Sequence, residues 1–347
     1  MSTPASLGFQ MPPEWAPQSA VWLSWPLSDR IWPGGLTDIQ ETFAHIAAAI
    51  SEHETCRINA DPAHHDTIRK SLARAKANLA SVELYPHPTN DVWCRDHGPI
   101  FVKHRDTGEL AITDWGFNAW GGKFEPYDLD DAVPGRVAES LGMRRFKAPM
   151  IAEGGALEVN GEGLLLTTES VLLTPTRNPQ LTKADNERIL RDYLGVTDIL
   201  WLPSGLEGDD TDGHIDTLTR FTSPRTVLTV TEDDPNDPNH AVLRRNIDIL
   251  EHHRFADGGK LEVIPLPLPG AIRPENWRED RLPATYANFL VINDAVLVPT
   301  YRQPRSDDMA CETIKACFPK RRIVRIDCHD IILEGGALHC LTQQQPL

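Results

Sequence analysis

Five side chains of the types used in hydrolytic chemistry stand in short polar stretches that follow apolar segments. They are one thiol, one imidazole and three carboxylates: Cys340, His214, Asp96, Glu153 and Asp216. Taken singly, each has an ordinary structural explanation, because acids often pair with a nearby arginine and most cysteines are simply buried. Taken together, the thiol and the imidazole could perform nucleophilic and acid–base catalysis on a substrate that the carboxylates hold.

The three carboxylates restrict the kind of substrate. At about 4 Å each pair of like charges costs on the order of 4 kcal/mol at an effective dielectric constant of 20, so a cation is needed to offset them. A metal ion is one candidate, because the stretch EGDDTDGHID (207–216) is rich in oxygen ligands. However, no HxH, HxxxH or CxxC spacing occurs, and the terminal glutamate of an EF-hand loop is missing. A planar guanidinium fits better, since it pairs with carboxylate oxygens two at a time. We therefore expect no metal and no other cofactor.

The pentapeptide Glu-Gly-Gly-Ala-Leu occurs twice, at 153–157 and at 334–338. The first copy leads into Glu158 and the second into His339-Cys340. In the second copy Gly335 and Gly336 would let the backbone approach closely beside the thiol. Two such similar stretches so far apart suggest that they occupy equivalent positions in a repeated architecture.

A unit of helix, strand, polar loop and hairpin recurs along the chain. Its first copy begins with Asp61-Pro62, a good helix N-cap followed by proline, continues as a helix over 61–79 and a strand over 81–86, and reaches the polar loop 89–99. Further helices are predicted near 130–142, 182–195, 238–254 and 307–318, and strands within 144–152, 197–203, 260–269 and 321–327. Hairpin patterns follow most loops, at 100–115, 156–169, 216–230 and 289–301.

Equivalent loops of five repeated units would meet at a common axis, with Asp96, Glu153, His214, Asn288 and Glu334 at matching positions. The fifth unit ends before its second hairpin strand could form, so we expect the N-terminal stretch 20–26 to supply that strand and close a ring. We therefore predict one α/β domain over residues 1–347. A doubly wound parallel sheet is the alternative, but the hairpins and the lack of a Gly-rich phosphate loop after the first strand argue against it.

The amino-acid composition limits the kinds of molecule that the protein is expected to bind. The chain has 347 residues, of which 34 are basic and 50 acidic, and its formal charge of −16 disfavours nucleic acid and anionic membranes and mildly favours a cationic ligand. Six scattered cysteines and no signal-peptide pattern predict a cytoplasmic protein with free thiols. No apolar run approaches the roughly 20 residues of a membrane span. The acidic surface is compatible with a dimer or a higher homo-oligomer.

Seven stretches resemble the agmatine deiminases and the bacterial peptidylarginine-deiminase-type proteins of the guanidine-group-modifying superfamily. They are NDVWCRDHGP, FNAWGG, EGGALEVNGEGLLLTTE, RNPQLTK, WLPSGLEGDDTDGHID, YANFLVIN and GGALHCLTQQQP, and the resemblance covers essentially residues 11–346. It implies a five-bladed α/β propeller (the pentein fold) and a metal-free hydrolysis of agmatine to N-carbamoylputrescine and ammonia, a step of putrescine biosynthesis. By position, Cys340 is similar to the family nucleophile, His214 to its general acid/base, and Asp96, Glu153 and Asp216 to its guanidinium-binding acids.

The residues themselves suggest the same mechanism. The thiolate of Cys340 would attack the guanidinium carbon, and His214 would protonate the departing ammonia and then activate the water that hydrolyses a covalent thiouronium. Asp96 and Asp216 would fix the two terminal nitrogens while Glu153 balances the remaining charge. Because three carboxylates should raise the pKa of the thiol, we expect the charge of the substrate to promote thiolate formation.

Several neighbouring residues have alternative interpretations. Trp93 and Trp120 could enclose an alkyl chain or a cation of the substrate, or they could be core aromatics. Cys94 is expected to turn away from the site by alternation along an extended loop. His339 is expected to face away from Cys340, because adjacent residues of a strand point to opposite faces. The family commonly has GGGNIHC and EGGSIHV where this chain has EGGALHC and EGGALEV, which leaves the tail of the substrate open.

Three other functions remain open from the sequence. A peptidylarginine deiminase, or a deiminase of another guanidine, would use the same chemistry but, for a peptide, would need an open site. A non-catalytic propeller that binds polyamines or guanidines would release no ammonia. A metal-dependent hydrolase would lose its activity to a chelator.

Overall fold

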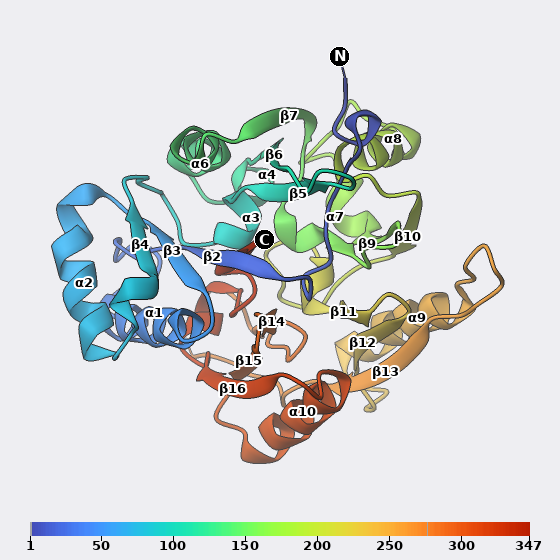
Figure 1. Ribbon diagram of the computed structural model, residues 1–347. Coiled ribbons are helices and arrows are strands. Elements are labelled where there is room, and N and C mark those ends of the chain that lie inside the picture. Colours follow the sequence, from blue (N-terminus) through green and yellow to red (C-terminus); the bar gives the residue numbers. More distant parts are fainter. Residues whose placement is uncertain (1, 276) are drawn as a thin grey trace.

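The computed structural model describes residues 2–275 and 277–347, and within them the strands form five separate sheets. The sheets surround a common centre, and the longer helices lie outside them (Figure 1). This arrangement is the five-bladed α/β propeller that the sequence predicts. The doubly wound alternative, which requires one continuous sheet, is wrong.

Each sheet combines an antiparallel pair with a strand that returns in parallel. In strand order the sheets are β1 (Phe9–Gln10), β5 (Ile100–His104), β6 (Leu110–Gly116), β7 (Arg144–Ile151); β8 (Glu158–Val159), β9 (Leu164–Thr168), β10 (Asp198–Leu202); β11 (Thr219–Ser223), β12 (Thr226–Thr231), β13 (Glu262–Pro267); β14 (Leu290–Val291), β15 (Ala295–Thr300), β16 (Arg322–Asp327); and β17 (Thr342–Pro346), β2 (Gln18–Ser24), β3 (Thr55–Asn59), β4 (Val82–Tyr85).

Helices connect the parallel strands, because such strands cannot be joined by a tight turn. The crossover helices are α1 (Leu36–Ser51), α2 (His65–Arg74), α6 (Val133–Leu141), α8 (Lys183–Leu194), α9 (Pro238–His252) and α10 (Pro304–Cys317). Short helical segments α3 (Cys94–His97), α4 (Ala119–Gly122), α5 (Asp128–Asp131) and α7 (Glu169–Leu172) lie in the loops. The polar loops that follow β4, β7, β10, β13 and β16 each lead from one sheet into the next. The predicted repeat therefore begins in one blade and ends in its neighbour.

Ring closure follows the sequence prediction. Strand β17, at the C-terminus, pairs antiparallel with β2, with Thr342 opposite Leu23 and Gln345 opposite Ala20. Strand β2 pairs in parallel with β3 on its other side. The repeat pattern did not predict α1 and β3, which make this blade one helix and one strand larger than the three-stranded blades.

Local capping signals were read correctly, although one helix is shorter than expected. The side chain of Asp61 accepts a hydrogen bond from the backbone of Ala63, but after a 3₁₀ turn the helix ends at Arg74. Helix α8 begins at the capping box of Thr182 and Asp185 and ends at Gly195, whose φ of +69° is left-handed.

The middle strands of two blades are buried along their whole length. Every residue of β9 and of β15 is buried, as expected for strands covered on both faces. The apolar runs in the sequence are therefore propeller strands, and across residues 2–275 and 277–347 no helix is long and apolar enough to cross a membrane.

Candidate active site

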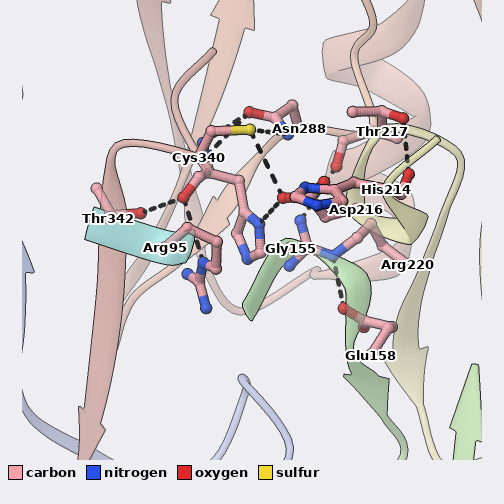
Figure 2. A network of polar contacts seen from close by, with 12 residues as sticks. Arg95, Gly155, Glu158, His214, Asp216, Thr217, Arg220, Asn288, Cys340 and Thr342 are labelled. Atoms are coloured by element: carbon pink, nitrogen blue, oxygen red, sulfur yellow. Dashed lines mark hydrogen bonds and ion pairs between the residues drawn. The ribbon is translucent and has the colours of Figure 1, made fainter. Parts of the chain in front are cut away.

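Cys340 lies in a tight turn that leads directly into β17. The backbone N–H of Leu341 donates to the carbonyl of Ala337 (3.3 Å), and that of Thr342 donates to His339 (3.0 Å). Asn288 holds this turn from the neighbouring blade: its Oδ1 accepts from the backbone of His339 (2.9 Å) and its Nδ2 donates to Sγ of Cys340 at 3.2 Å (Figure 2). In the sequence Asn288 is only a marker of the repeat, and nothing in its spacing indicates this contact.

Asp216 approaches the thiol from the loop before β11. Its Oδ2 lies 3.7 Å from Sγ of Cys340 (Figure 2) and accepts a hydrogen bond from Nδ1 of His339 at 2.7 Å. The expectation that His339 faces away from Cys340 is wrong, because these residues form a turn rather than a strand. Both side chains approach one carboxylate oxygen.

Asp96 lies on α3, and two hydrogen-bond donors fix its carboxylate. Its Oδ2 accepts from the indole of Trp120 (3.0 Å), and its Oδ1 accepts from the backbone of Gly155 (3.1 Å). Trp120 stands in a left-handed turn in which Ala119 (φ +50°) and Trp120 (φ +55°) precede two glycines. Left-handed backbone at two non-glycine residues costs energy and occurs mostly at functional sites.

His214 and Glu153 form a fully buried pair beneath this pocket. Nε2 of His214 lies 3.9 Å from Oε2 of Glu153, and its Nδ1 lies 3.6 Å from Oδ1 of Asp96. The other oxygen of Glu153 accepts from Nε of Arg177 at 2.7 Å, and Arg177 also pairs with Asp212 at 2.6 Å. Arg177 is not among the residues predicted from the sequence, although it lies in the stretch RNPQLTK that carries part of the family resemblance.

The repeated glycine pairs permit these close approaches. A Cβ atom at Gly154 would collide with the carbonyl of Arg95, and one at Gly155 would collide with the ring of His214. At Gly336 a Cβ would enter the ring of Trp93. The two Gly-Gly pairs thus let loops of two blades crowd the axis.

The buried charges set the protonation states. Burial lowers the pKa of His214, but the carboxylates of Asp96 and Glu153 outweigh burial and raise this pKa to about 9. The pKa of Glu153 falls to about 2, because His214 and Arg177 outweigh burial, whereas burial raises the pKa of Asp96 to about 7. Burial and then Asp216 raise the pKa of the Cys340 thiol well above its usual value. At neutral pH the resting site therefore holds a thiol and an imidazolium.

Several buried polar atoms of this cluster lack a hydrogen-bond partner within the described residues: Oε2 of Glu153, both ring nitrogens of His214 and Oδ1 of Asp216. Unpaired buried polar groups are costly and rare, so their concentration at one point indicates a place for a polar ligand. In residues 2–275 and 277–347 no group of three or more His, Cys, Asp and Glu side chains is placed to hold a metal ion.

A cavity of about 390 Å³, its open mouth included, leads from the surface to Cys340. Trp93 and Trp120 line it, as do Asp96, Gly335 and Gly336. The two indoles also belong to the main hydrophobic core, so they are core aromatics that line the cavity, and their contact with a substrate stays a prediction. Cys94 is buried in the helical turn of α3 near Asn59, and the extended loop assumed for it is wrong.

The mouth of the cavity is crossed by Arg278. Its guanidinium pairs with Glu334 (2.7 Å) and with Asp210 (3.0 Å) and lies over the ring of Phe124 at 5.3 Å. The indole of the preceding Trp277 donates to the carbonyl of Leu333 at 2.6 Å. Glu334, whose counterpart in the first copy is Glu153, therefore anchors the cavity mouth.

The chain matches one family over nearly its whole length. The sequence model of the Porphyromonas-type peptidyl-arginine deiminase family matches residues 10–346. The agmatine deiminases of Pseudomonas syringae pv. tomato and Pseudomonas aeruginosa are 38% and 37% identical to it, each over 99% of this chain and 97% of the relative. The structure of the agmatine deiminase of Enterococcus faecalis superposes with a TM-score of 0.92 at 34% identity, covering 100% of this chain and 98% of that one.

A second structure agrees. The agmatine deiminase of C. jejuni, solved with substrate bound, superposes with a TM-score of 0.87 at 30% identity over 97% of this chain and 96% of that one. Sequence and structure comparisons thus cover the same residues as the five blades. The chain belongs to the Porphyromonas-type peptidyl-arginine deiminase family.

Proposed function

We propose that the protein is an agmatine deiminase, which hydrolyses agmatine to N-carbamoylputrescine and ammonia through a covalent intermediate on Cys340. The observation that carries the proposal is a buried thiol beside a cluster of carboxylates in which Oδ1 of Asp216 and Oε2 of Glu153 lack hydrogen-bond partners among the described residues. A guanidinium offers planar N–H groups to such oxygens, and its charge balances theirs. The full-length relatives named agmatine deiminase support the same substrate.

Binding would place the guanidinium between Asp96 and Asp216. Oδ1 of Asp216 is free to accept from one terminal nitrogen, and Asp96 faces the other from across the pocket. Glu153, paired with Arg177, faces His214 and keeps the imidazolium charged. The carbon atom would then stand in front of Sγ of Cys340, so positioning contributes much of the catalysis.

The first half-reaction forms the covalent intermediate. The bound cation lowers the pKa of the thiol, the thiol proton leaves to solvent, and the thiolate forms a bond to the guanidinium carbon. His214, charged at rest, gives its proton to one terminal nitrogen, and the C–N bond breaks to release ammonia. A thiouronium cation remains on Cys340.

The second half-reaction returns the enzyme to its starting state. The neutral imidazole of His214 takes a proton from water, and the oxygen attacks the thiouronium carbon. The hydroxyl group of this adduct then loses its proton to the departing sulfur as the C–S bond breaks, which releases the substituted urea and restores the thiol of Cys340 beside the imidazolium of His214. One residue serves as acid and then as base, which its environment between two carboxylates makes favourable.

The cavity mouth favours a small substrate over a peptide. Arg278 lines the cavity and is bound to Glu334 and Asp210, and Trp277 is hydrogen-bonded to Leu333, so these contacts hold the strap at 277–278 beside the cavity. A peptidyl arginine would have to displace this strap, whereas the ammonium tail of agmatine could meet the acids around it. The free thiols further favour a reducing compartment, and we propose a cytoplasmic location for the protein.

The deciding experiment is an ammonia-release assay with agmatine, arginine and a blocked arginine peptide, on the wild type and on Cys340→Ala. We expect release from agmatine by the wild type alone. Release from the peptide at a comparable rate would favour a peptidylarginine deiminase. Binding of agmatine without ammonia from any guanidine would overturn the enzymatic proposal and favour a binding protein.

A further inference from the structure

A chain of buried charged groups runs from Asp216 to the N-terminal segment. Nε2 of His339 lies 2.7 Å from Oε2 of Glu14, while its Nδ1 lies 2.7 Å from Asp216. The same oxygen of Glu14 accepts from Nη2 of Arg220 (2.6 Å), and Nε of Arg220 donates to Glu158 at 2.9 Å (Figure 2). None of these five side chains is more than 7% exposed.

The geometry fixes the charge of His339. A neutral imidazole has one N–H and one lone pair, and a lone pair facing a carboxylate at 2.7 Å would be repelled. Burial would raise the pKa of Glu14, but Arg220 and His339 outweigh burial and hold it well below its usual range. Burial likewise opposes ionisation of Asp216, and His339 lowers the pKa of Asp216. Both acids are therefore ionised, and the ring between them is an imidazolium.

Glu14 is itself fixed by the rest of the ring. Its Oε1 accepts from the backbone of Val291 at 2.7 Å. Arg220 is anchored by the carbonyls of Ala287 (3.1 Å) and Phe289 (2.7 Å). His339 is consequently held at both ends by groups that cannot move without disturbing two blades.

We propose that Glu14 and His339 are positioning residues: Glu14 holds the ring of His339, and His339 occupies Oδ2 of Asp216, so that Oδ1 of Asp216 alone is presented to the substrate guanidinium. The inference rests on the proposed function but concerns residues for which that function required no role. Without the imidazolium, the only remaining contact of Oδ2 among the described groups is the Cys340 thiol at 3.7 Å. Asp216 could then rotate, and it would hold its negative charge less readily.

Two variants test the relay, by which we mean the contacts that link Glu14 through His339 to Asp216. His339→Asn keeps an amide nitrogen near the position of Nδ1 but removes the charge, and Glu14→Gln removes the second carboxylate. Both should lower kcat/KM for agmatine by about 10- to 100-fold. Because the folded-state pKa of Asp216 would rise, the acid limb of the kcat/KM profile should move to higher pH.

Other charges around Asp216 stay in place in these variants. They come from α3, from the loop before β11, from β11 itself and from the turn before β17, namely Arg95, Asp96, Asp209, His214, Arg220 and Cys340. Glu158→Gln is the matched control, because Glu158 binds the same Arg220 but does not touch His339. Glu158→Gln should show the same acid limb of the kcat/KM profile as the wild type, even if the substitution changes the temperature of thermal unfolding.

A second readout does not depend on turnover. The pH dependence of Cys340 alkylation by iodoacetamide, followed by mass spectrometry, should shift to higher pH in His339→Asn, since a cation near the thiol is lost. The proposed role of His339 would be overturned if His339→Asn left both the acid limb and the alkylation profile unchanged. It would also be overturned if Glu158→Gln shifted them by the same amount as His339→Asn. A wild type that releases no ammonia would instead overturn the proposed function, and the alkylation profiles would still decide on the relay.

Discussion

At the scale of single residues, the protonation state of Cys340 in the resting site is not the one that the proposed reaction requires. Burial and Asp216 raise the pKa of the Cys340 thiol, and Asp96 and Glu153 keep His214 charged although burial opposes it. A thiolate and an imidazolium are required together, and the site supplies only the second. The missing charge balance would come from the substrate, so the enzyme is expected to be weakly reactive towards neutral electrophiles.

This difference predicts how Cys340 reacts with alkylating reagents. Iodoacetamide is neutral, whereas a haloacetamidine carries the charge of a guanidinium. Inactivation by the cationic reagent should show a lower apparent pKa than inactivation by the neutral one, because only the first offsets the carboxylates. The rates would be measured from pH 6 to 10 with Cys340→Ser as the unlabelled control. The same apparent pKa for both reagents would show that substrate charge does not promote the thiolate.

The pKa of His214 predicts the alkaline side of the activity profile. Its folded-state pKa, about 9, lies above the ordinary value of 6.5 for histidine, so the acid form is present below about pH 9 and is lost as the pH rises through it. Since this form protonates the leaving ammonia, kcat/KM should fall above about pH 9. Butylguanidine, which lacks the ammonium of agmatine, removes titration of the substrate tail from the measurement. A profile that stays flat to pH 10 with butylguanidine would contradict the assignment of His214.

At the scale of elements, loops between blades build the site. The sequence predicted the convergence of Asp96, Glu153, His214 and Asp216, because equivalent loops of a repeated unit must meet at the axis. Arg177, Arg220 and Glu14 were missed, since each acts only through a partner from a distant segment. His339 was misplaced because a turn was taken for a strand. Spacing along the chain therefore revealed the groups that we propose to face the substrate better than the groups behind them.

The strap over the cavity mouth gives a prediction about the substrate tail. Glu334→Gly would leave Arg278 with Asp210 as its remaining ion-pair partner in the described part of the chain. The mouth then gains one unit of positive charge, so KM for agmatine should rise about 2- to 5-fold, as expected for a partly exposed ion pair. KM for butylguanidine, which has no tail charge, should stay the same. Equal increases for both substrates would mean that Glu334 acts on the shape of the site and not on tail charge.

At the scale of the whole molecule, the two ends of the chain complete one blade. Strand β2 lies between β17 and β3, and Glu14, just before β2, reaches the relay behind Asp216. The sequence predicted this closure because five units with four complete hairpins leave one open edge. The added helix α1 and strand β3 could not be predicted in this way, since they break the repeat. We propose that the ring folds as one domain.

Removal of the closing strand should therefore unfold the ring. Deleting residues 2–26 takes away β2 with Val21, Trp22 and Leu23, each fully buried. Burial of such side chains contributes about 1.5–3 kcal/mol each, or roughly 5–9 kcal/mol for three, which is comparable with the whole stability of about 5–15 kcal/mol of a domain. Deleting only residues 2–6 leaves β1, Glu14 and β2 intact and is the matched control. Thermal unfolding followed by circular dichroism should show a melting transition near that of the full chain for the short deletion and no cooperative transition for the long one. If both deletions melt like the full chain, the propeller does not depend on its N-terminal strand for closure.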